Sequence, residues 1–243
     1  MSKPAIALFK KDMRITRIFW APMAFSYSLF LLMFMENIWV YLATGAGLTF
    51  VAAAIALAID DFYRADPLFA ALPGTRRDLV AGRYLSWAMI TAAGLALFLA
   101  DTALLRVGFG DRSPRLGTLL SLKGAAAFLI GTLLAGLVFL PFHFRLGFWR
   151  GMWGFTATGF VLTVAALNTI ARLVPEEAYG GAGSIDRLPA AFGPTARGLR
   201  SLAWLIDRNV GAPLVLAVAA LILALLSFLS YRLSVRFYRK RDL

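Results

Sequence analysis

The sequence predicts an all-α polytopic membrane protein with six transmembrane helices, an N-terminal interfacial helix and a short amphipathic segment at the inner surface. Hydrophobic residues make up 60% of the 243 residues and charged residues only 16%, with a mean hydropathy of +0.74. Soluble domains are about a quarter charged. Six stretches are apolar over 17 to 22 residues, close to the ~20 residues that cross ~30 Å of hydrocarbon. They are continuously apolar rather than alternating, which favours helices over barrel strands.

The six predicted spans are separated by charged or proline-containing segments. Glu36 closes the first span, Asp60 closes the second, and Pro141 closes the fourth. No stretch has the composition of a soluble domain, so we expect a single transmembrane domain over 1–243. The spans are 18–35, 39–59, 84–105, 124–140, 151–170 and 212–231.

The charged residues indicate a membrane surface as the partner and predict the orientation. The net charge is +12, and in so apolar a chain basic residues are typical of the edge of an anionic membrane rather than of nucleic-acid binding. With the N-terminus cytoplasmic, the inner segments carry 16 Lys and Arg residues and the outer segments carry 9. We therefore expect a multi-pass protein of the cell (inner or plasma) membrane with both termini cytoplasmic. The absence of cysteine and the single histidine exclude disulfides and Cys/His metal clusters.

The N-terminal segment 3–17 has an apolar side and a basic remainder. Ile6, Phe9 and Met13 share one side, with Leu8 and Ile15 on an adjoining row. This spacing predicts a helix lying on the inner leaflet. A basic flank that orients the first span explains the same residues, and both interpretations can hold together.

The inner connection 60–83 is too apolar for a free loop, and Pro67 and Pro73 cut it into short pieces. Thr75 has the character of an N-cap for a helix that begins at Arg76, with Asp78 at the third position completing a capping box. That helix could continue into the third span. The segment should fold against a partner's groove or against the inner helix ends of this chain.

Ionisable residues near the membrane allow two other interpretations. Asp60, Asp61 and Asp66 could hold Mg²⁺ on a diphosphate, as in an intramembrane transferase, but the sequence offers no second acidic cluster. Asp101 lies inside the third span, where a carboxylate is a candidate for proton transport in a secondary carrier. We favour structural pairing of Asp101 with Arg106 or Lys123.

Two further residues or motifs bear on catalysis. His143 is expected to be the polar tip of an aromatic cluster rather than a base. The sequence has no G-x-x-x-x-G-K-[ST] motif, so we expect no ATP site of the P-loop type on this chain.

Three inner segments together resemble the membrane subunits of ABC-2 type transporters. The first consists of Asp61, Leu72-Pro73, Arg76, Val80 and Arg83-Tyr84; it is similar to an acidic residue followed by L-P-[VI]-[ST]-R-x-x-[IV]-x-x-[KR]-Y. The second, PFHFRLGFWR over 141–150, is similar to P-[LF]-x-[YF]-[KR]-x-G-[YF]. The third is the tail from Leu233-Ser234 through Tyr238 to Asp242. Gly74 and Arg83 depart from the usual residues of that pattern without changing a charge.

The resemblance implies a permease without enzymatic activity of its own. A separate ATPase subunit would bind ATP and Mg²⁺, so no cofactor is expected on this chain, and a second permease copy or a paralogue would complete an export path. The resemblance also implies which residues meet the ATPase subunit. They are Asp61, Leu72, Pro73, Arg76, Arg77, Asp78, Leu79 and Arg83, together with Phe144, Arg145 and Gly147 in the second inner loop.

Overall fold

The computed structural model describes residues 3–33, 38–63, 75–109, 116–173 and 213–240, and all the elements in these ranges are helices. The chain divides into two compact units, Met1–Met152 with Ile222–Leu243, and Trp153–Leu221. The helices are α1 (Lys3–Thr16), the single 3₁₀ turn η1 (Arg17–Phe19), α2 (Trp20–Met33), α3 (Ile38–Phe62), α5 (Arg76–Phe109), α6 (Leu116–Leu119), α7 (Leu122–Leu146), α8 (Phe148–Leu173) and α10 (Pro213–Lys240).

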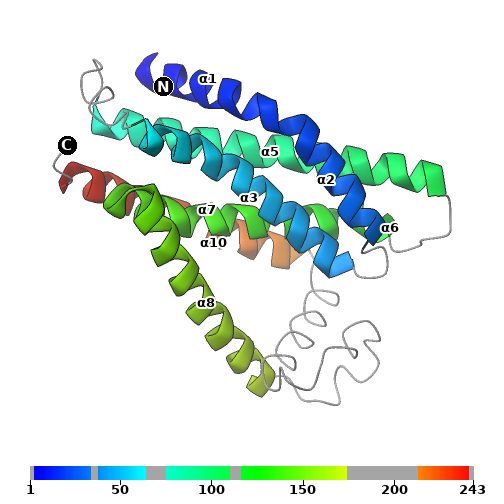
Figure 1. The fold of residues 1–243 in the computed structure, drawn as a ribbon. Helices are drawn as coiled ribbons and strands as arrows, with labels where there is room; N and C mark the ends of the chain where they lie inside the picture. Colours follow the sequence, from blue (N-terminus) through cyan, green and yellow to red (C-terminus); the bar gives the residue numbers. More distant parts are fainter. Residues whose placement is uncertain (1–2, 34–37, 64–74, 110–115, 174–212, 241–243) are drawn as a thin grey trace. The chain divides into compact units, whose positions relative to one another are not determined.

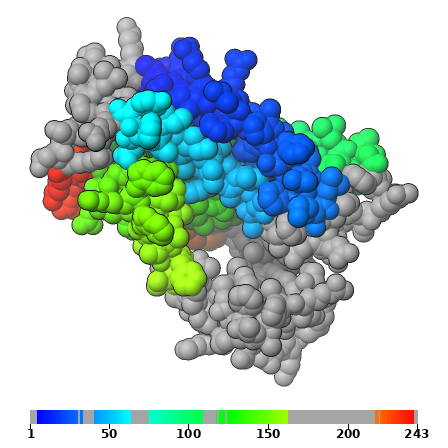
Figure 2. Space-filling model, viewed as in Figure 1, coloured from blue at the N-terminus to red at the C-terminus, as the bar shows by residue number. Residues whose placement is uncertain are grey.

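The first unit is a helix bundle in which α5 is the central element. This 34-residue helix packs against α1, α2, α3 and α7 (Figure 1). In the space-filling view, α1, α2 and α3 lie together on one face of this unit (Figure 2). The second unit contains the continuation of α8 from Trp153 and the start of α10 up to Leu221.

Four helices of the described chain are long and apolar enough to cross a membrane. They cover Tyr41–Phe62, Arg76–Gly108, Gly124–Leu146 and Ala220–Lys240 and correspond to the second, third, fourth and sixth predicted spans. The first predicted span falls on η1 and α2, of which α2 has 14 residues, about 21 Å of helix. The fifth falls on α8, which has 26 residues. The described residues therefore confirm an all-α fold with candidate membrane spans. The number of six spans remains a prediction.

The sequence predicts that the fourth span ends at Pro141, and this prediction is wrong. Helix α7 includes Pro141 and continues to Leu146. Proline lacks the N–H that would bond the carbonyl four residues earlier, which here belongs to Leu137. The hydroxyl of Ser230 in α10 donates to that carbonyl at 2.6 Å, so the helix passes the proline without leaving the Leu137 oxygen unbonded.

The predicted loop over 141–150 is consequently much shorter than expected. Only Gly147 lies between α7 and α8, with φ of 80°, a conformation that favours glycine. Its N–H donates to the carbonyl of His143 at 2.9 Å, and α8 begins at the next residue.

Close helix contacts hold the bundle core together. The Tyr41 ring stacks on Phe98 with centroids 4.8 Å apart. A Cβ at Gly136 of α7 would lie 2.0 Å from the indole nitrogen of Trp87 in α5, so only glycine allows α5 and α7 to approach this closely. Small residues at helix contacts are typical of membrane bundles.

Candidate functional site at the basic end of the bundle

The first turn of α5 begins with the capping box that the sequence predicted. The Thr75 backbone N–H and hydroxyl donate to Asp78 Oδ2 at 2.9 and 2.7 Å, and the Asp78 N–H donates to Thr75 Oγ1 at 3.3 Å. The helix starts at Arg76 and continues without interruption into the third span. Both predictions are confirmed. The capping box can be predicted from sequence because it depends only on residues three apart in the chain.

Arg76 joins the start of α5 to the end of α10. Its Nη1 donates to the carbonyls of Tyr238 and Arg239 at 2.8 and 3.1 Å, and its guanidinium lies 5.7 Å from the Tyr238 ring centroid. The last carbonyls of a helix have no partner within the helix and carry partial negative charge. Arg76 therefore caps α10 with a cation and fixes the two helix ends to each other.

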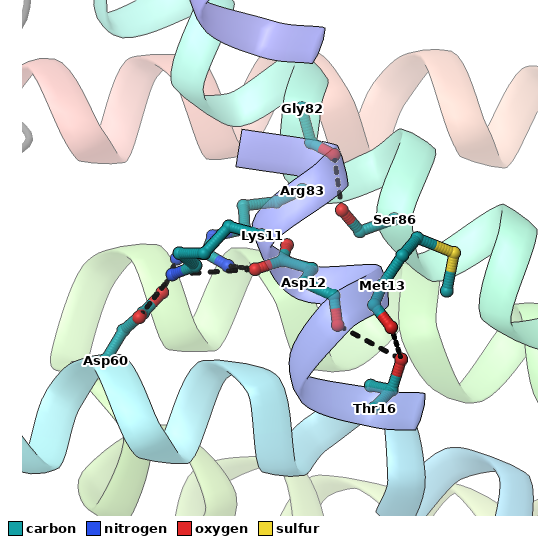
Figure 3. Close-up of polar contacts among 8 residues, drawn as sticks. All are labelled: Lys11, Asp12, Met13, Thr16, Asp60, Gly82, Arg83 and Ser86. Atoms are coloured by element: carbon teal, nitrogen blue, oxygen red, sulfur yellow. Dashed lines mark hydrogen bonds and ion pairs between the residues drawn. The ribbon is translucent and has the colours of Figure 1, made fainter. Parts of the chain in front are cut away.

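Four charged side chains, which we call the charge cluster, connect α1, α3 and α5 (Figure 3). They are Lys11 and Asp12 of α1, Asp60 of α3 and Arg83 of α5. Arg83 Nη1 donates to Asp12 Oδ1 at 2.6 Å, and its Nη2 pairs with Asp60 Oδ2. Lys11 Nζ pairs with Asp60 Oδ1 and lies 3.5 Å from Asp12 Oδ1. One guanidinium thus bridges carboxylates from two other helices.

The charge cluster is largely removed from solvent. The side chains of Asp12 and Arg83 are 1% and 6% exposed. Two cations and two anions balance, which is the condition under which buried charges are tolerated. Burial lowers the pKa of Lys11 to about 8, and the neighbouring Arg83 guanidinium acts in the same direction, while Asp12 acts against both.

The sequence of α1 explains how it approaches α5 so closely. Its buried face consists of Ala5, Leu8, Asp12 and Thr16, which recur at helical spacing. A Cβ at Gly82 of α5 would lie 3.1 Å from the Ala5 carbonyl oxygen. The structure has a helix over the predicted segment, and its buried face differs from the apolar side formed by Ile6, Phe9 and Met13, of which Ile6 is 38% exposed. The location of this helix on the inner leaflet remains a prediction.

The turn between α7 and α8 packs against the end of α10. The Phe144 ring contacts Tyr238 with centroids 5.5 Å apart, and Arg145 lies over the Phe237 ring at 5.3 Å. His143 has Phe139, Phe144 and Phe148 as ring neighbours, which confirms the prediction of an aromatic cluster. The start of α5, the α7–α8 turn and the end of α10 therefore meet at one end of the first unit.

A network of hydroxyl groups extends this junction towards the middle of the bundle. The Tyr84 hydroxyl of α5 bonds Ser230 and Ser234 of α10, the latter at 2.9 Å. Ser230 also donates to Leu137 of α7. These bonds connect the same three helices, α5, α7 and α10, about two helical turns from Arg76 and Phe144.

The residues predicted to meet an ATPase subunit take different positions. Arg77 is exposed, and Asp61 is partly exposed at the end of α3. Leu79 is buried within the bundle, Asp78 caps α5, and Arg83 belongs to the charge cluster. Leu72 and Pro73 lie outside the described residues.

Sequence reasoning missed several members of this end of the bundle. The sequence alone places Lys11 and Asp12 only in a basic segment, and Ser230 and Tyr238 only in the last span and the tail. One signal was available: Asp12 is the single acidic residue in 3–17 and lies four positions after Leu8, on the same helix face.

The contacts bear differently on the two acidic alternatives. Asp60 is paired with Lys11 and Arg83, and Asp66 lies outside the described residues. Asp101 accepts a hydrogen bond from the Ser28 hydroxyl, and no ion pair of the described residues joins it to Arg106. The side chain of Lys123, the other predicted partner, is not described.

The long apolar helices of the described chain define it as a multi-pass helical membrane protein. The start of α5, the α7–α8 turn and the end of α10 form the basic end of its bundle. The model of one protein family, described as ABC-2 family transporter protein, matches residues 7–186. The match covers most of the chain, so the protein belongs to the ABC-2 family of transporter proteins and is a membrane permease of the ABC transporter class. Searches of curated proteins and of solved structures gave no match.

Proposed function

We propose that this chain is the permease subunit of an ATP-driven exporter and that a separate ATPase subunit docks at the basic end of its bundle. The observation that carries this proposal is the family match over residues 7–186, because ABC-2 permeases work with an ATP-binding subunit. ATP and Mg²⁺ would bind to that partner. A second permease copy or a paralogue would complete the path across the membrane.

The contacts at the basic end support its role in coupling. A displacement applied to the first turn of α5 acts on α10 through Arg76 and on α1 and α3 through Arg83. Three other helices, α1, α3 and α10, are therefore tied by charged contacts to the segment of α5 from Arg76 to Arg83. Coupling requires a bundle with two arrangements that the partner stabilises differently, and such ties would let one contact bias several helices together.

Arg77 is the residue that we expect to contact the ATPase subunit most directly. It is exposed, whereas Arg76, Asp78 and Leu79 are engaged within the chain. Asp61 is the second candidate because it is partly exposed at the end of α3.

Charge reversal at Arg77 tests the proposal. A tagged full-length chain carrying Arg77→Glu should co-purify less P-loop ATPase than wild type while reaching the membrane in equal amount. A glutamate in the first turn of a helix is favourable for the helix dipole, so loss of binding would not come from unfolding of α5. The matched control is Arg106→Glu, which reverses an exposed charge in the last turn of the same helix.

Equal ATPase recovery with wild type, Arg77→Glu and Arg106→Glu would show that Arg77 is not a docking residue. Recovery of no P-loop ATPase with the wild-type chain would contradict the function itself. A secondary carrier that uses Asp101 predicts substrate uptake driven by a pH gradient in vesicles that contain this chain alone.

A further inference from the structure

A pocket of about 720 Å³ lies at the basic end of α10 within the first unit. Its basic lining residues come from two helices: Arg77 of α5 and Arg232, Arg236, Arg239 and Lys240 of α10. Leu229 and Leu233 contribute apolar wall, and the described residues that line the pocket include no acidic side chain. The pocket therefore combines concentrated positive charge with an apolar side.

The pocket continues a single face of α10 that changes character along the helix. Ile222, Leu225 and Leu229 are exposed by 51%, 55% and 50% and recur at three- and four-residue spacing. The same spacing continues to Arg232 and Arg236, which are also exposed. At 1.5 Å per residue, the apolar part from Ile222 to Leu229 is about 10 Å long and adjoins the basic part.

We propose that this pocket binds the headgroup phosphate of an anionic phospholipid whose acyl chains lie along the apolar face of α10. Guanidinium groups donate paired hydrogen bonds that match phosphate oxygens. Basic pockets beside apolar helices at the inner membrane surface suit anionic headgroups. Five cations that line one pocket also repel one another, and a bound phosphate relieves that repulsion.

The apolar face distinguishes a lipid from the other anionic occupants. Free phosphate would use the arginines but leave Ile222, Leu225 and Leu229 uncovered. An acidic surface of a soluble partner would not reach a stripe that lies at the depth of the acyl chains. The inference goes beyond the proposed function and does not rest on it, because lipid binding is measured without ATP or a transported substrate.

Native mass spectrometry of the full-length chain, purified with whatever subunits accompany it, provides the test. The probe is an equimolar mixture of phosphatidylglycerol and phosphatidylcholine with identical acyl chains. The wild-type chain should retain phosphatidylglycerol in preference. The double variant Arg232→Gln/Arg236→Gln should bind phosphatidylglycerol about thirty-fold more weakly, on the scale of about a fivefold factor for each basic residue near an anionic surface.

The matched control is Lys10→Gln/Arg14→Gln, which removes two exposed positive charges from α1 and should retain the lipid preference. Glycerol phosphate, which has the headgroup charge without acyl chains, should not displace the lipid. Equal losses in the two double variants, equal retention of the two lipids by wild type, or displacement by glycerol phosphate would each overturn the proposal. Unchanged lipid retention in Arg232→Gln/Arg236→Gln with loss of a co-purifying protein would assign the pocket to a protein partner instead.

Discussion

Arg83 reaches Asp12 and Asp60 with its two terminal nitrogens, and this geometry makes it the residue on which the charge cluster depends. A guanidinium has a planar fork that can bond two carboxylates at once, whereas an ammonium is a point charge. Such a buried cluster adds little net stability over a well-packed apolar core, but removal of one member leaves the others uncompensated. The cluster therefore determines how α1, α3 and α5 meet more than how stable the bundle is.

Replacement of Arg83 by glutamine should destabilise the protein by about 3–5 kcal/mol, the cost of leaving a buried charge without its partner. Thermal unfolding in detergent micelles would measure the effect, with Arg83→Lys intermediate. Arg77→Gln removes an exposed arginine from the same helix and should change stability by about 0.5 kcal/mol or less. Equal unfolding temperatures for Arg83→Gln and Arg77→Gln would contradict the role of the bridge.

The depressed pKa of Lys11 predicts a pH dependence of stability. Because its pKa is lowered to about 8 from the ordinary 10.5, the unfolded chain binds more protons than the folded chain between these values. The contribution of Lys11 to the free energy of unfolding should therefore rise as pH rises from about 8 to 10.5. Below that window both states are protonated and the contribution is constant.

Lys11→Gln isolates this contribution. The unfolding temperature of wild type minus that of Lys11→Gln should increase across that window. The same difference for Lys10→Gln, which changes the neighbouring exposed lysine, supplies the baseline. A difference that stays flat or falls with pH would show that the two carboxylates, rather than burial, dominate the environment of Lys11.

At the scale of elements, α7 shows how a proline can lie inside a membrane helix. The carbonyl of Leu137 has no N–H partner at Pro141, and Ser230 of another helix supplies the missing donor. In hydrocarbon an unbonded carbonyl is costly, so such a donor is needed where helices contain proline. The interaction also fixes α7 beside α10, at the level where Tyr84 bonds Ser230 and Ser234.

A double-mutant cycle tests this interpretation of Ser230. Ser230→Ala should destabilise the wild-type chain but cost about 1 kcal/mol less in a Pro141→Ala background, because alanine restores the N–H for the Leu137 carbonyl. Ser227→Ala is the control, since Ser227 donates to the carbonyl of Leu223 in its own helix. Additive effects of Ser230→Ala and Pro141→Ala would contradict the account.

The elements that the sequence predicted well are those defined by local patterns. The Thr75–Asp78 capping box and the helix that follows depend on neighbouring residues, and the apolar spans depend on composition. The charge cluster could not be predicted in the same way, because Asp12 and Arg83 are 71 residues apart and basic residues near span ends have a general explanation in topology. Local sequence rules predict a helix end at Pro141, because the hydroxyl that compensates for the missing N–H belongs to Ser230 in another helix.

At the scale of the whole molecule, the basic helix ends gather on one side of the first unit. Lys11, Arg83, Arg76 and the end of α10 are brought together there, although they come from the start, middle and end of the chain. This arrangement agrees with the excess of Lys and Arg in the predicted inner segments. It places the candidate docking residue Arg77 and the lipid pocket at the same end of the bundle.

Cysteine labelling tests the predicted orientation, and the chain is suited to it because it contains no cysteine. Tyr63 and Val107 are 74% and 85% exposed and lie near the predicted inner end of α3 and the predicted outer end of α5. A membrane-impermeant maleimide should label Val107→Cys in intact cells and Tyr63→Cys only after permeabilisation. The reverse pattern would place the basic end outside and remove the docking surface from the cytoplasm.

ATP hydrolysis by purified material tests the central claim most directly. The account predicts that the chain isolated alone hydrolyses no ATP, that the complex recovered with its P-loop ATPase does, and that Arg77→Glu lowers the activity recovered with the chain while Arg106→Glu preserves it. ATP turnover by the isolated chain, or purification of the functional transporter without any ATPase, would contradict the account.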